Sequence, residues 1–324
     1  MELERIGRLA QRIKDNIKQV IVGKDHVIDQ LLISLIASGH VLLEDVPGTG
    51  KTLLAKSLAK SLDCSFKRVQ FTPDLLPSDL SGINFYNQKT GEFEFRPGPI
   101  FTNILLGDEI NRATPRTQSS LLECMEEGQV TVDGETRQLD RPFMVIATQN
   151  PVETQGTFPL PEAQLDRFLI KVDMGYPSTE EGIEILRRFK ETNPLADIRP
   201  VASQDEIIEA QQNYSKVYVS QDILRYIVKI VEMTRQHSEV VLGVSPRGSQ
   251  ALLKAAQVYA IMRGRDFVSP DDVKDIIKPV LGHRIILRNV MGKREGQLET
   301  IIEQILKLVE VPAEDIPLEQ EGEL

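Results

Sequence analysis

The stretch that decides the fold is Val41-Leu42-Leu43-Glu44-Asp45-Val46-Pro47-Gly48-Thr49-Gly50-Lys51-Thr52. It opens with three apolar residues, a run that is too short for a helix and typical of a central parallel strand. Helical periodicity follows from Thr52 to Leu62. A glycine-rich loop between a strand and a helix, ending in Gly50-Lys51-Thr52, matches the end of the phosphate-binding P-loop pattern.

The residues of this loop have the chemistry to hold ATP or ADP together with Mg²⁺. Gly48 and Gly50 let backbone N–H groups turn toward a phosphate, and the N-terminus of the following helix adds partial positive charge. Lys51 is expected to reach the β- and γ-phosphates, and the Thr52 hydroxyl to bind Mg²⁺. Asp45 replaces the first glycine of the pattern, at the position that contacts phosphate least. The expected nucleotide-binding residues are Val46, Pro47, Gly48, Thr49, Gly50, Lys51, Thr52 and Leu53.

Polar residues follow two further apolar runs. The first run ends in Asp108 and Glu109, and the second, Phe143–Thr148, shortly precedes Asn150. The carboxyl ends of parallel strands meet at one ligand-binding edge, so these side chains are expected near the loop. Asp108 is predicted to hold Mg²⁺, Glu109 to orient and deprotonate a water, and Asn150 to hydrogen-bond the γ-phosphate or that water. A turn-initiating asparagine before Pro151 is the alternative for Asn150.

Strand-like runs alternate with helical patterns up to Tyr176, which predicts an α/β fold with a parallel five-stranded sheet and helices on both faces. Two alternating segments, Asn84–Phe95 and Gln129–Leu139, predict inserted hairpins, the second turning at Asp133-Gly134. The later pattern is purely helical, so we expect an α/β domain at 1–176, an all-α lid at 177–311 and an acidic tail at 312–324. The predicted strands are 41–43, 66–71, 104–107, 143–148 and 168–172, and the predicted helices are 3–20, 27–38, 52–62, 115–127, 179–190, 205–212, 221–237, 249–262, 270–281 and 297–308.

Composition narrows the class of protein. The chain has 324 residues and a net charge of −10, which argues against a constitutive nucleic-acid binder, since such a protein needs a basic surface. Its most apolar stretch, Leu31–Leu43, is too short to span a membrane, and no signal peptide opens the chain. Two cysteines without metal-like spacing indicate structural thiols in a reducing compartment. We therefore expect a cytoplasmic protein.

The assembled motifs resemble those of the MoxR family of AAA+ ATPases, in the clade with an insert in helix 2 and a hairpin before sensor 1. The similarity extends over nearly the whole chain. Its most specific segments are Asp108-Glu109-Ile110-Asn111-Arg112-Ala113, Gln118–Glu126, Val130-Thr131-Val132-Asp133-Gly134, Ala147-Thr148-Gln149-Asn150-Pro151, Leu160–Phe168 and Ser245-Pro246-Arg247.

The resemblance implies roles for individual residues. Lys51 and Thr52 fall in Walker A, Asp108 and Glu109 in Walker B, and Asn150 at sensor 1. The further residues and segments that it marks are Arg167 as arginine finger, Arg247 as sensor 2, Ile21, Val22 and Gly23 as an adenine-pocket strip, 71–101 as the helix 2 insert and 129–139 as the hairpin before sensor 1. It also implies a homo-oligomeric, hexameric ring that remodels a protein client, often one with a von Willebrand factor A domain.

Some interpretations stay open at this point. For Arg167, the alternative to the arginine finger is a local ion pair with Asp166. Arg247 could reach the γ-phosphate as the lid closes. Its alternative is a solvent-exposed arginine in the first turn of a helix. Arg112 is predicted to contact either a neighbour's phosphate or a structural acid. His283 is predicted to be a partly buried structural residue, with a ring contact as the alternative.

Two other functions compete with the client-remodelling ATPase. One is a nucleotide-gated binding adaptor with little turnover, which the intact set Asp108, Glu109 and Asn150 disfavours. The other is a helicase- or chelatase-type motor. A helicase would need basic hairpin tips, but Lys89 and Arg137 are accompanied by acidic neighbours, and nothing in the chain indicates a porphyrin site.

Overall fold

The computed structural model describes residues 2–44, 48–150, 156–190, 193–288 and 296–312. A five-stranded parallel sheet lies at its centre, in the strand order β2-β5-β8-β1-β9. All five strands lie where the sequence predicts them, within two residues at each end. Their bounds are β1 (Val41–Glu44), β2 (Phe66–Gln70), β5 (Ile104–Asp108), β8 (Met144–Gln149) and β9 (Ile170–Val172).

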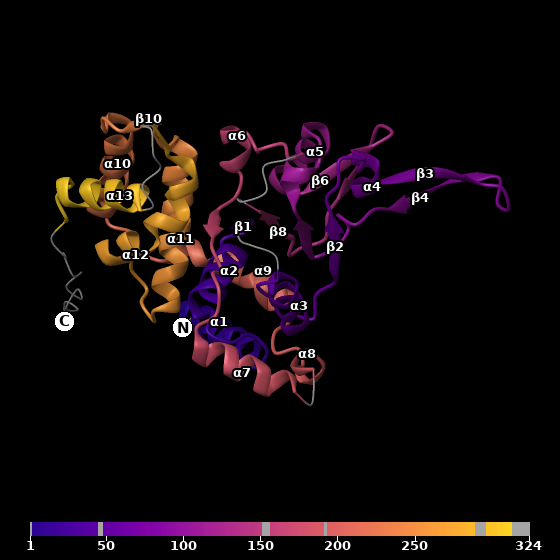
Figure 1. Cartoon of the computed structure of the whole chain (residues 1–324), viewed down its shortest axis with the longest axis horizontal. Coiled ribbons are helices and arrows are strands. Elements are labelled where there is room, and N and C mark those ends of the chain that lie inside the picture. Colours follow the sequence, from indigo (N-terminus) through magenta and orange to yellow (C-terminus); the bar gives the residue numbers. More distant parts are fainter. Residues whose placement is uncertain (1, 45–47, 151–155, 191–192, 289–295, 313–324) are drawn as a thin grey trace, which may run out of the picture.

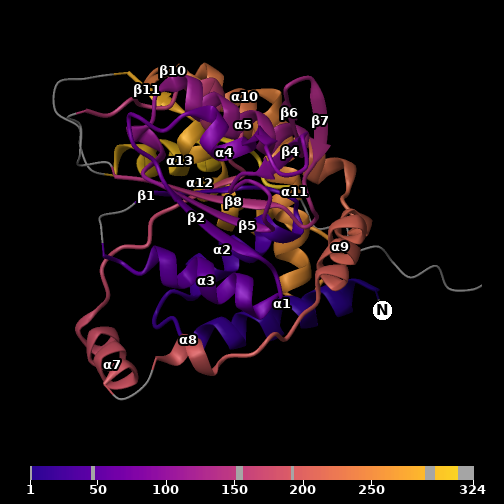
Figure 2. The same cartoon turned by 90° about the vertical axis from the view of Figure 1, so that its right-hand side faces the viewer.

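Helices cover both faces of the sheet, as Figure 2 shows. Successive side chains of a strand point to opposite faces, so Val41 and Leu43 join one buried cluster while Leu42 joins another. The first cluster packs beneath α1 (Glu2–Lys18), α2 (Asp25–Ile36) and α3 (Lys51–Ser61), and the second beneath α4 (Pro77–Ser81) and α5 (Pro115–Glu127). This arrangement confirms the predicted α/β class.

The helices after residue 177 fall into two groups. One group returns to the N-terminal helices and comprises α7 (Thr179–Phe189), α8 (Pro194–Asp197) and α9 (Gln204–Asn213). The other forms a compact bundle at one end of the molecule in Figure 1 and comprises α10 (Gln221–Gln236), α11 (Pro246–Met262), α12 (Pro270–Leu281) and α13 (Gln297–Leu308). The bundle shares one continuous apolar core with α1 and α2.

Several short elements have no counterpart in the predicted pattern. A two-stranded antiparallel pair, β10 (Val240–Leu242) with β11 (Ile286–Leu287), lies within the helical bundle that the sequence predicts as purely helical. Strands of two and three residues carry too little alternation to be recognised. The other short elements without a predicted counterpart are the helices α4, α6 (Glu162–Leu165) and α8 and the 3₁₀ turns η1 (Ile110–Arg112), η2 (Tyr214–Lys216) and η3 (Gly282–Arg284).

Two hairpins leave the sheet, as predicted, and contact one another. They are formed by β3 (Gly82–Asn87) with β4 (Glu92–Pro97) and by β6 (Gln129–Val132) with β7 (Glu135–Gln138). Asn84 Nδ2 donates a 2.8 Å hydrogen bond to Asp133 Oδ2, and the Arg137 guanidinium lies 3.9 Å from the centre of the Phe95 ring. The β3–β4 hairpin projects from the end of the molecule opposite the bundle (Figure 1).

A buried histidine joins three elements of the core. His40 precedes β1, and its Nδ1 accepts a 3.0 Å hydrogen bond from the Val145 N–H of β8. Its Nε2 lies 2.9 Å from the Met125 carbonyl oxygen near the end of α5. Accepting at Nδ1 and donating at Nε2 requires the neutral ring. Burial lowers the pKa of His40 to about 4.

We expect acidification to destabilise the chain through His40. The unfolded chain takes up the proton near pH 6.5, whereas the folded chain resists it until about pH 4, so stability is complete above the unfolded value and is lost as the pH falls. The free energy of unfolding should fall by about 2 kcal/mol between pH 6.5 and pH 5 from this residue. Urea denaturation across this range would measure the slope.

The matched comparison is His40→Gln, which should flatten this slope, against His26→Gln, which changes an exposed histidine and should leave it unaltered. An identical slope in the unmodified chain and in His40→Gln would contradict the assignment.

Candidate functional site

The carboxyl ends of three neighbouring strands lie level in the sheet. The register aligns Leu43 of β1 with Thr148 of β8, and Ala147 with Gly107 of β5. Strands lie about 4.8 Å apart, so the carboxyl end of β1 lies within about 10 Å of the residues that follow β5. The structure therefore brings the glycine-rich loop, the two acids and Asn150 to one edge of the sheet.

The described part of the loop has an open, left-handed backbone at its glycines. Gly48 and Gly50 have φ values of +89° and +95°, and no atom lies within 4 Å of a Cβ added at either residue. Gly50 is the N-cap of α3, which begins at Lys51. Thr49, Lys51 and Thr52 are half-buried, and Leu53 packs against the core. The predicted contacts Val46 and Pro47 lie outside the described residues.

Thr148 holds the two acids in place. Its hydroxyl donates a 2.6 Å hydrogen bond to Asp108 Oδ1 and accepts a 2.9 Å hydrogen bond from the Glu109 N–H. Glu109 has the left-handed backbone conformation, with φ 58° and ψ 51°. Such a conformation costs a non-glycine residue about 1–3 kcal/mol and occurs preferentially at functional sites. The left-handed conformation turns the chain at Glu109 away from the direction of β5, which ends at Asp108.

Side chains of β2 and of η1 also hold the acids. Arg68 Nη2 lies 2.6 Å from Asp108 Oδ2 and donates a 3.0 Å hydrogen bond to Gln70 Oε1. Gln70 Nε2 donates to Glu109 Oε2 over 2.7 Å, and Arg112 Nε lies 2.9 Å from the same oxygen. The acid that Arg112 contacts is thus Glu109 itself.

The predicted arginines lie at the opposite edge of the sheet. Arg167 Nε lies 3.1 Å from Glu126 Oε2, and Arg247 pairs with Oε1 of the same carboxylate. The cavity that they line also contacts Ser38, Gly39 and His40, which precede β1, whereas the glycine-rich loop follows it. The four residues of β1 span about 13 Å. In this conformation neither arginine is placed to reach the loop of its own chain.

A buried cation fastens the helical bundle beside Arg167. Arg284 Nε lies 2.6 Å from Asp166 Oδ1, and Ser245 donates a 2.9 Å hydrogen bond to Oδ2. Asp166 therefore pairs with the bundle and not with Arg167, its neighbour in sequence. Burial lowers the pKa of Arg284, and the hydrogen bond from Arg284 to Asp166 opposes this. His283 Nε2 lies 3.1 Å from the Phe168 carbonyl oxygen, in the buried environment predicted for it.

Comparisons with known proteins agree with this geometry. Residues 40–170 match the ATPase family associated with various cellular activities (AAA), and residues 232–305 match the AAA lid domain. The chain is 53% identical to the uncharacterised protein YeaC of Bacillus subtilis over 96% of its length and 97% of that protein. It is 41% identical to chaperone MoxR1 of Mycobacterium tuberculosis, covering 91% of this chain and 80% of that one. The chain belongs to the MoxR family of AAA+ ATPases.

A solved structure supports the same assignment. The crystal structure of a protein from Cytophaga hutchinsonii has a TM-score of 0.87 and 40% sequence identity to this MoxR-family chain, covering 96% of this chain and 97% of that one. Family membership supports an ATPase with a chaperone-like role. Among the described residues, no helix combines the length and apolar character needed to cross a membrane.

The chain's own residues suit the nucleotide and metal that such an ATPase uses. Mg²⁺ prefers hard oxygen ligands, and the Thr52 hydroxyl and Asp108 carboxylate provide them at the same sheet edge as Lys51. Thr148 and Arg68 are second-layer partners that orient the Asp108 carboxylate.

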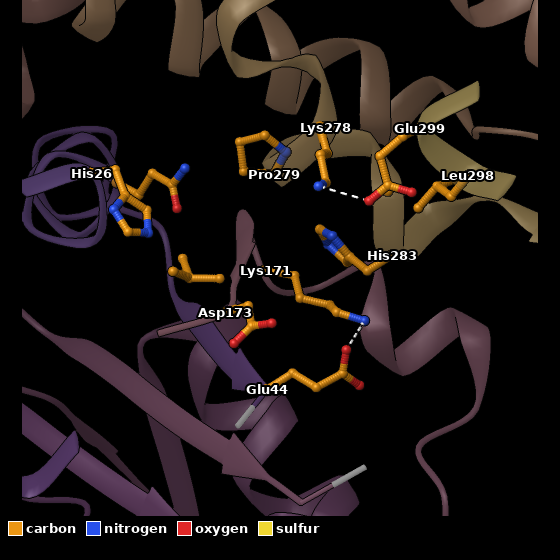
Figure 3. A pocket seen from close by; sticks show the side chains of 12 residues that line it. His26, Glu44, Lys171, Asp173, Lys278, Pro279, His283, Leu298 and Glu299 are labelled. Carbon is orange, nitrogen blue, oxygen red and sulfur yellow. Dashed lines mark ion pairs between the residues drawn. The ribbon is translucent and has the colours of Figure 1, made fainter. Parts of the chain in front are cut away.

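A cavity of about 420 Å³ lies at the carboxyl ends of β1 and β9, between α2 and the bundle (Figure 3). Gln149 Nε2 donates to Glu44 Oε1 over 2.7 Å, and Lys171 pairs with the other oxygen of Glu44. Of the predicted adenine strip, Ile21 is buried, Val22 half-buried, and a Cβ at Gly23 would lie 1.9 Å from Glu181 Oε1. The strip itself does not line the cavity, but His26 and Gln30 of the helix that follows it do.

Several functional partners were missed by reasoning from the sequence. Thr148 and Gln70 could have been found, because each is a polar residue near the carboxyl end of a strand that neighbours β5. Arg68 lies two residues earlier on the same strand as Gln70. Glu126 gave no signal, since its role depends on where the end of α5 meets two distant segments.

We expect Arg68→Ala to strengthen Mg²⁺ binding. The Arg68 guanidinium occupies Asp108 Oδ2, so its removal frees a metal ligand from an ion pair. The pair is half-exposed and worth up to about 1 kcal/mol, so the Mg²⁺ concentration for half-maximal binding of fluorescent ATP should fall about threefold.

Lys67→Ala is the matched control, because Lys67 is the adjacent cation on β2 and donates to the Gly98 carbonyl instead of an acid. An unchanged or increased Mg²⁺ requirement in Arg68→Ala would show that Arg68 does not compete with the metal.

Proposed function

We propose that this chain hydrolyses ATP with Mg²⁺ as a homo-oligomeric ring and uses the reaction to remodel a protein client. The observation that carries the proposal is the division of the site between two sheet edges. The loop, Asp108, Glu109 and Asn150 gather at one edge, and Arg167 and Arg247 pair with Glu126 at the other. A subunit so built has a complete site only beside a neighbour.

Each residue at the carboxyl edge has a defined task in this proposal. Backbone N–H groups of residues 48–52 and the Lys51 ammonium hold the phosphates. Bound Mg²⁺, held by Thr52 and Asp108, would supply charge neutralisation at the β- and γ-phosphates. Glu109 orients the attacking water and accepts its proton, and Asn150 fixes the water or the γ-phosphate. The cavity beside Glu44 takes the base and ribose.

Glu109 must exchange partners for this role. Its Oε2 accepts contacts from Gln70 and Arg112, which hold the carboxylate in the resting chain. Water activation needs this carboxylate to face the γ-phosphate. Gln70 ends the strand β2, and the chain continues from it through α4 into the β3–β4 hairpin, so movement of that hairpin can reach Glu109 through the chain to Gln70 and the hydrogen bond from Gln70.

Arg167 and Arg247 complete the site of the adjacent subunit. A contact between the carboxyl edge of one copy and the opposite edge of the next is head-to-tail, and in the proposed assembly the rotation between copies closes it into a ring. Six subunits form the ring that we propose, with the helical part after residue 177 acting as its lid. Loss of the γ-phosphate then releases both arginines together and changes how neighbours contact each other.

The hairpins are the proposed client-binding elements. They form one body through Asn84–Asp133 and Arg137–Phe95. Tyr86 and Phe93 pack edge to face on β3–β4, and Phe93 remains 75% exposed. Exposed aromatic side chains of this kind mark protein-binding surfaces. A client with a von Willebrand factor A domain is proposed on the family resemblance alone.

The proposed location is the cytoplasm. Cys64 and Cys124 are both free thiols. Burial raises the pKa of each to about 12, so both stay protonated and unreactive at neutral pH. Unpaired thiols of this kind are typical of proteins in reducing compartments.

We expect Lys51→Ala and Glu109→Gln to separate binding from hydrolysis. Lys51→Ala removes the phosphate-binding cation, so affinity for Mg·ATP should fall at least about tenfold. Glu109→Gln keeps the loop but loses the base, so ATP should still bind while hydrolysis falls about 10²–10⁴-fold. Equilibrium binding of labelled ATP and phosphate release would measure the two effects.

Lys56→Ala, on the exposed side of α3, is the matched lysine control and should change neither property. Undiminished ATP binding by folded Lys51→Ala would refute the assigned phosphate site.

We also expect two inactive variants to restore activity when mixed. Lys51→Ala subunits keep their arginines but bind nucleotide weakly, whereas Arg167→Ala/Arg247→Ala subunits bind nucleotide but lack arginines. Either variant alone should lose about 10³-fold or more in hydrolysis, and a mixture should recover it where the two meet. The measurement is phosphate release against the total subunit concentration, and full activity of the dilute unmodified monomer would exclude a shared site.

A further inference from the structure

A second charged cavity lies at the amino edge of the sheet. It has a volume of about 280 Å³ and is bounded by the residues that precede β1, the end of α5 and the start of α11. Positive charge exceeds negative charge among the described residues that line it. The four cations and two carboxylates are Arg167, Arg247, Lys254, Arg284, Glu126 and Asp166.

One cation and one carboxylate of this cavity neutralise each other. Asp166 is fully engaged, because Arg284 Nε lies 2.6 Å from Oδ1 and the Ser245 hydroxyl donates to Oδ2. Arg284 also donates to backbone carbonyl oxygens, including that of Leu169 over 3.2 Å. This pair fixes the bundle in place and leaves Glu126 as the other carboxylate facing the remaining cations.

Glu126 is shared between the two functional arginines. Each of its oxygens pairs with one guanidinium, Oε2 with Arg167 and Oε1 with Arg247. The Arg167 Nε–H is not aimed at the carboxylate, so this buried nitrogen has an ionic partner at 3.1 Å but no hydrogen-bond partner. One negative charge therefore bridges two positive charges, and a donor remains unused.

We propose that Glu126 is a placeholder anion for the terminal phosphate of the neighbouring subunit's nucleotide. A terminal phosphoryl group carries more negative charge than a carboxylate and has three acceptor oxygens, so it can neutralise both guanidinium groups at once. Until it arrives, Glu126 offsets the repulsion between the two like charges. Ring formation with ATP exchanges one anion for the other.

This exchange of anions determines whether the Glu126 charge strengthens or weakens the ATP-dependent contact between subunits. The carboxylate competes with the incoming phosphate, so its charge weakens the ATP-dependent contact between subunits. Removing only the charge, as in Glu126→Gln, leaves an uncharged amide that competes less. The proposal rests on the proposed site shared between subunits. An experiment that mixes Lys51→Ala subunits with Arg167→Ala/Arg247→Ala subunits can therefore test it.

The experiment places Glu126→Gln only in the Lys51→Ala subunits that donate arginines. These are titrated against Arg167→Ala/Arg247→Ala subunits in the presence of Mg·ATP. We expect the donor concentration that gives half-maximal phosphate release to fall about fivefold, equivalent to about 1 kcal/mol. Glu127→Gln in the same donors is the matched control, because Glu127 is the next residue on α5, is exposed and does not line the cavity.

The outcomes are distinguishable. If donors with unmodified Glu126 fail to restore hydrolysis, the shared site is wrong. If they restore it but Glu126→Gln leaves the half-maximal concentration unchanged or raises it, the placeholder role is wrong. A lower plateau without a shift makes Glu126 a positioning residue instead and also overturns the proposal. Glu126→Ala serves as a second variant with the same expected direction, and failure of both variants to fold would make Glu126 purely structural.

Discussion

The level ends of β1, β8 and β5 are the constraint on which the candidate site depends. Thr148, at the end of the middle strand, binds Asp108 through its hydroxyl and receives the N–H of Glu109. A shift of one residue in the register of β8 would turn Thr148 to the other face of the sheet and leave both acids unsupported. The hydrogen bond from the Val145 N–H of β8 to His40 Nδ1 opposes such a shift.

Opposite charges hold the functional groups in the resting chain. Asp108 contacts Arg68, Glu109 contacts Arg112, and Arg167 contacts Glu126. Partly buried charges without partners are costly, so these pairs stabilise the subunit before any ligand arrives. In the proposed mechanism these pairs are rearranged for catalysis, and part of the binding free energy of nucleotide and neighbour is then spent on breaking them.

The sequence predicts those parts of the site that are formed by residues close to one another along the chain. Gly48, Gly50 and Lys51 act together because a strand, a loop and a helix follow one another, and the acids follow from an apolar run that ends in charge. Arg247 and Glu126 meet across 121 positions, and no local periodicity encodes such a contact. Apolar spacing alone predicts α11 only from residue 249, whereas Pro246 begins the helix three residues earlier, in agreement with the first helical turn expected at Arg247.

In the proposed ring, the separation of the loop and the arginines by the length of β1 gives each subunit a donor side and an acceptor side. A ring built from such subunits has one rotational sense, because every copy gives its arginines in the same direction. A copy that is impaired both in its loop and in its arginines then inactivates its own site and also the neighbouring site that depends on those arginines. In a mixture of active and inactive chains, ATP hydrolysis would therefore fall more steeply than in proportion to the fraction of inactive chains.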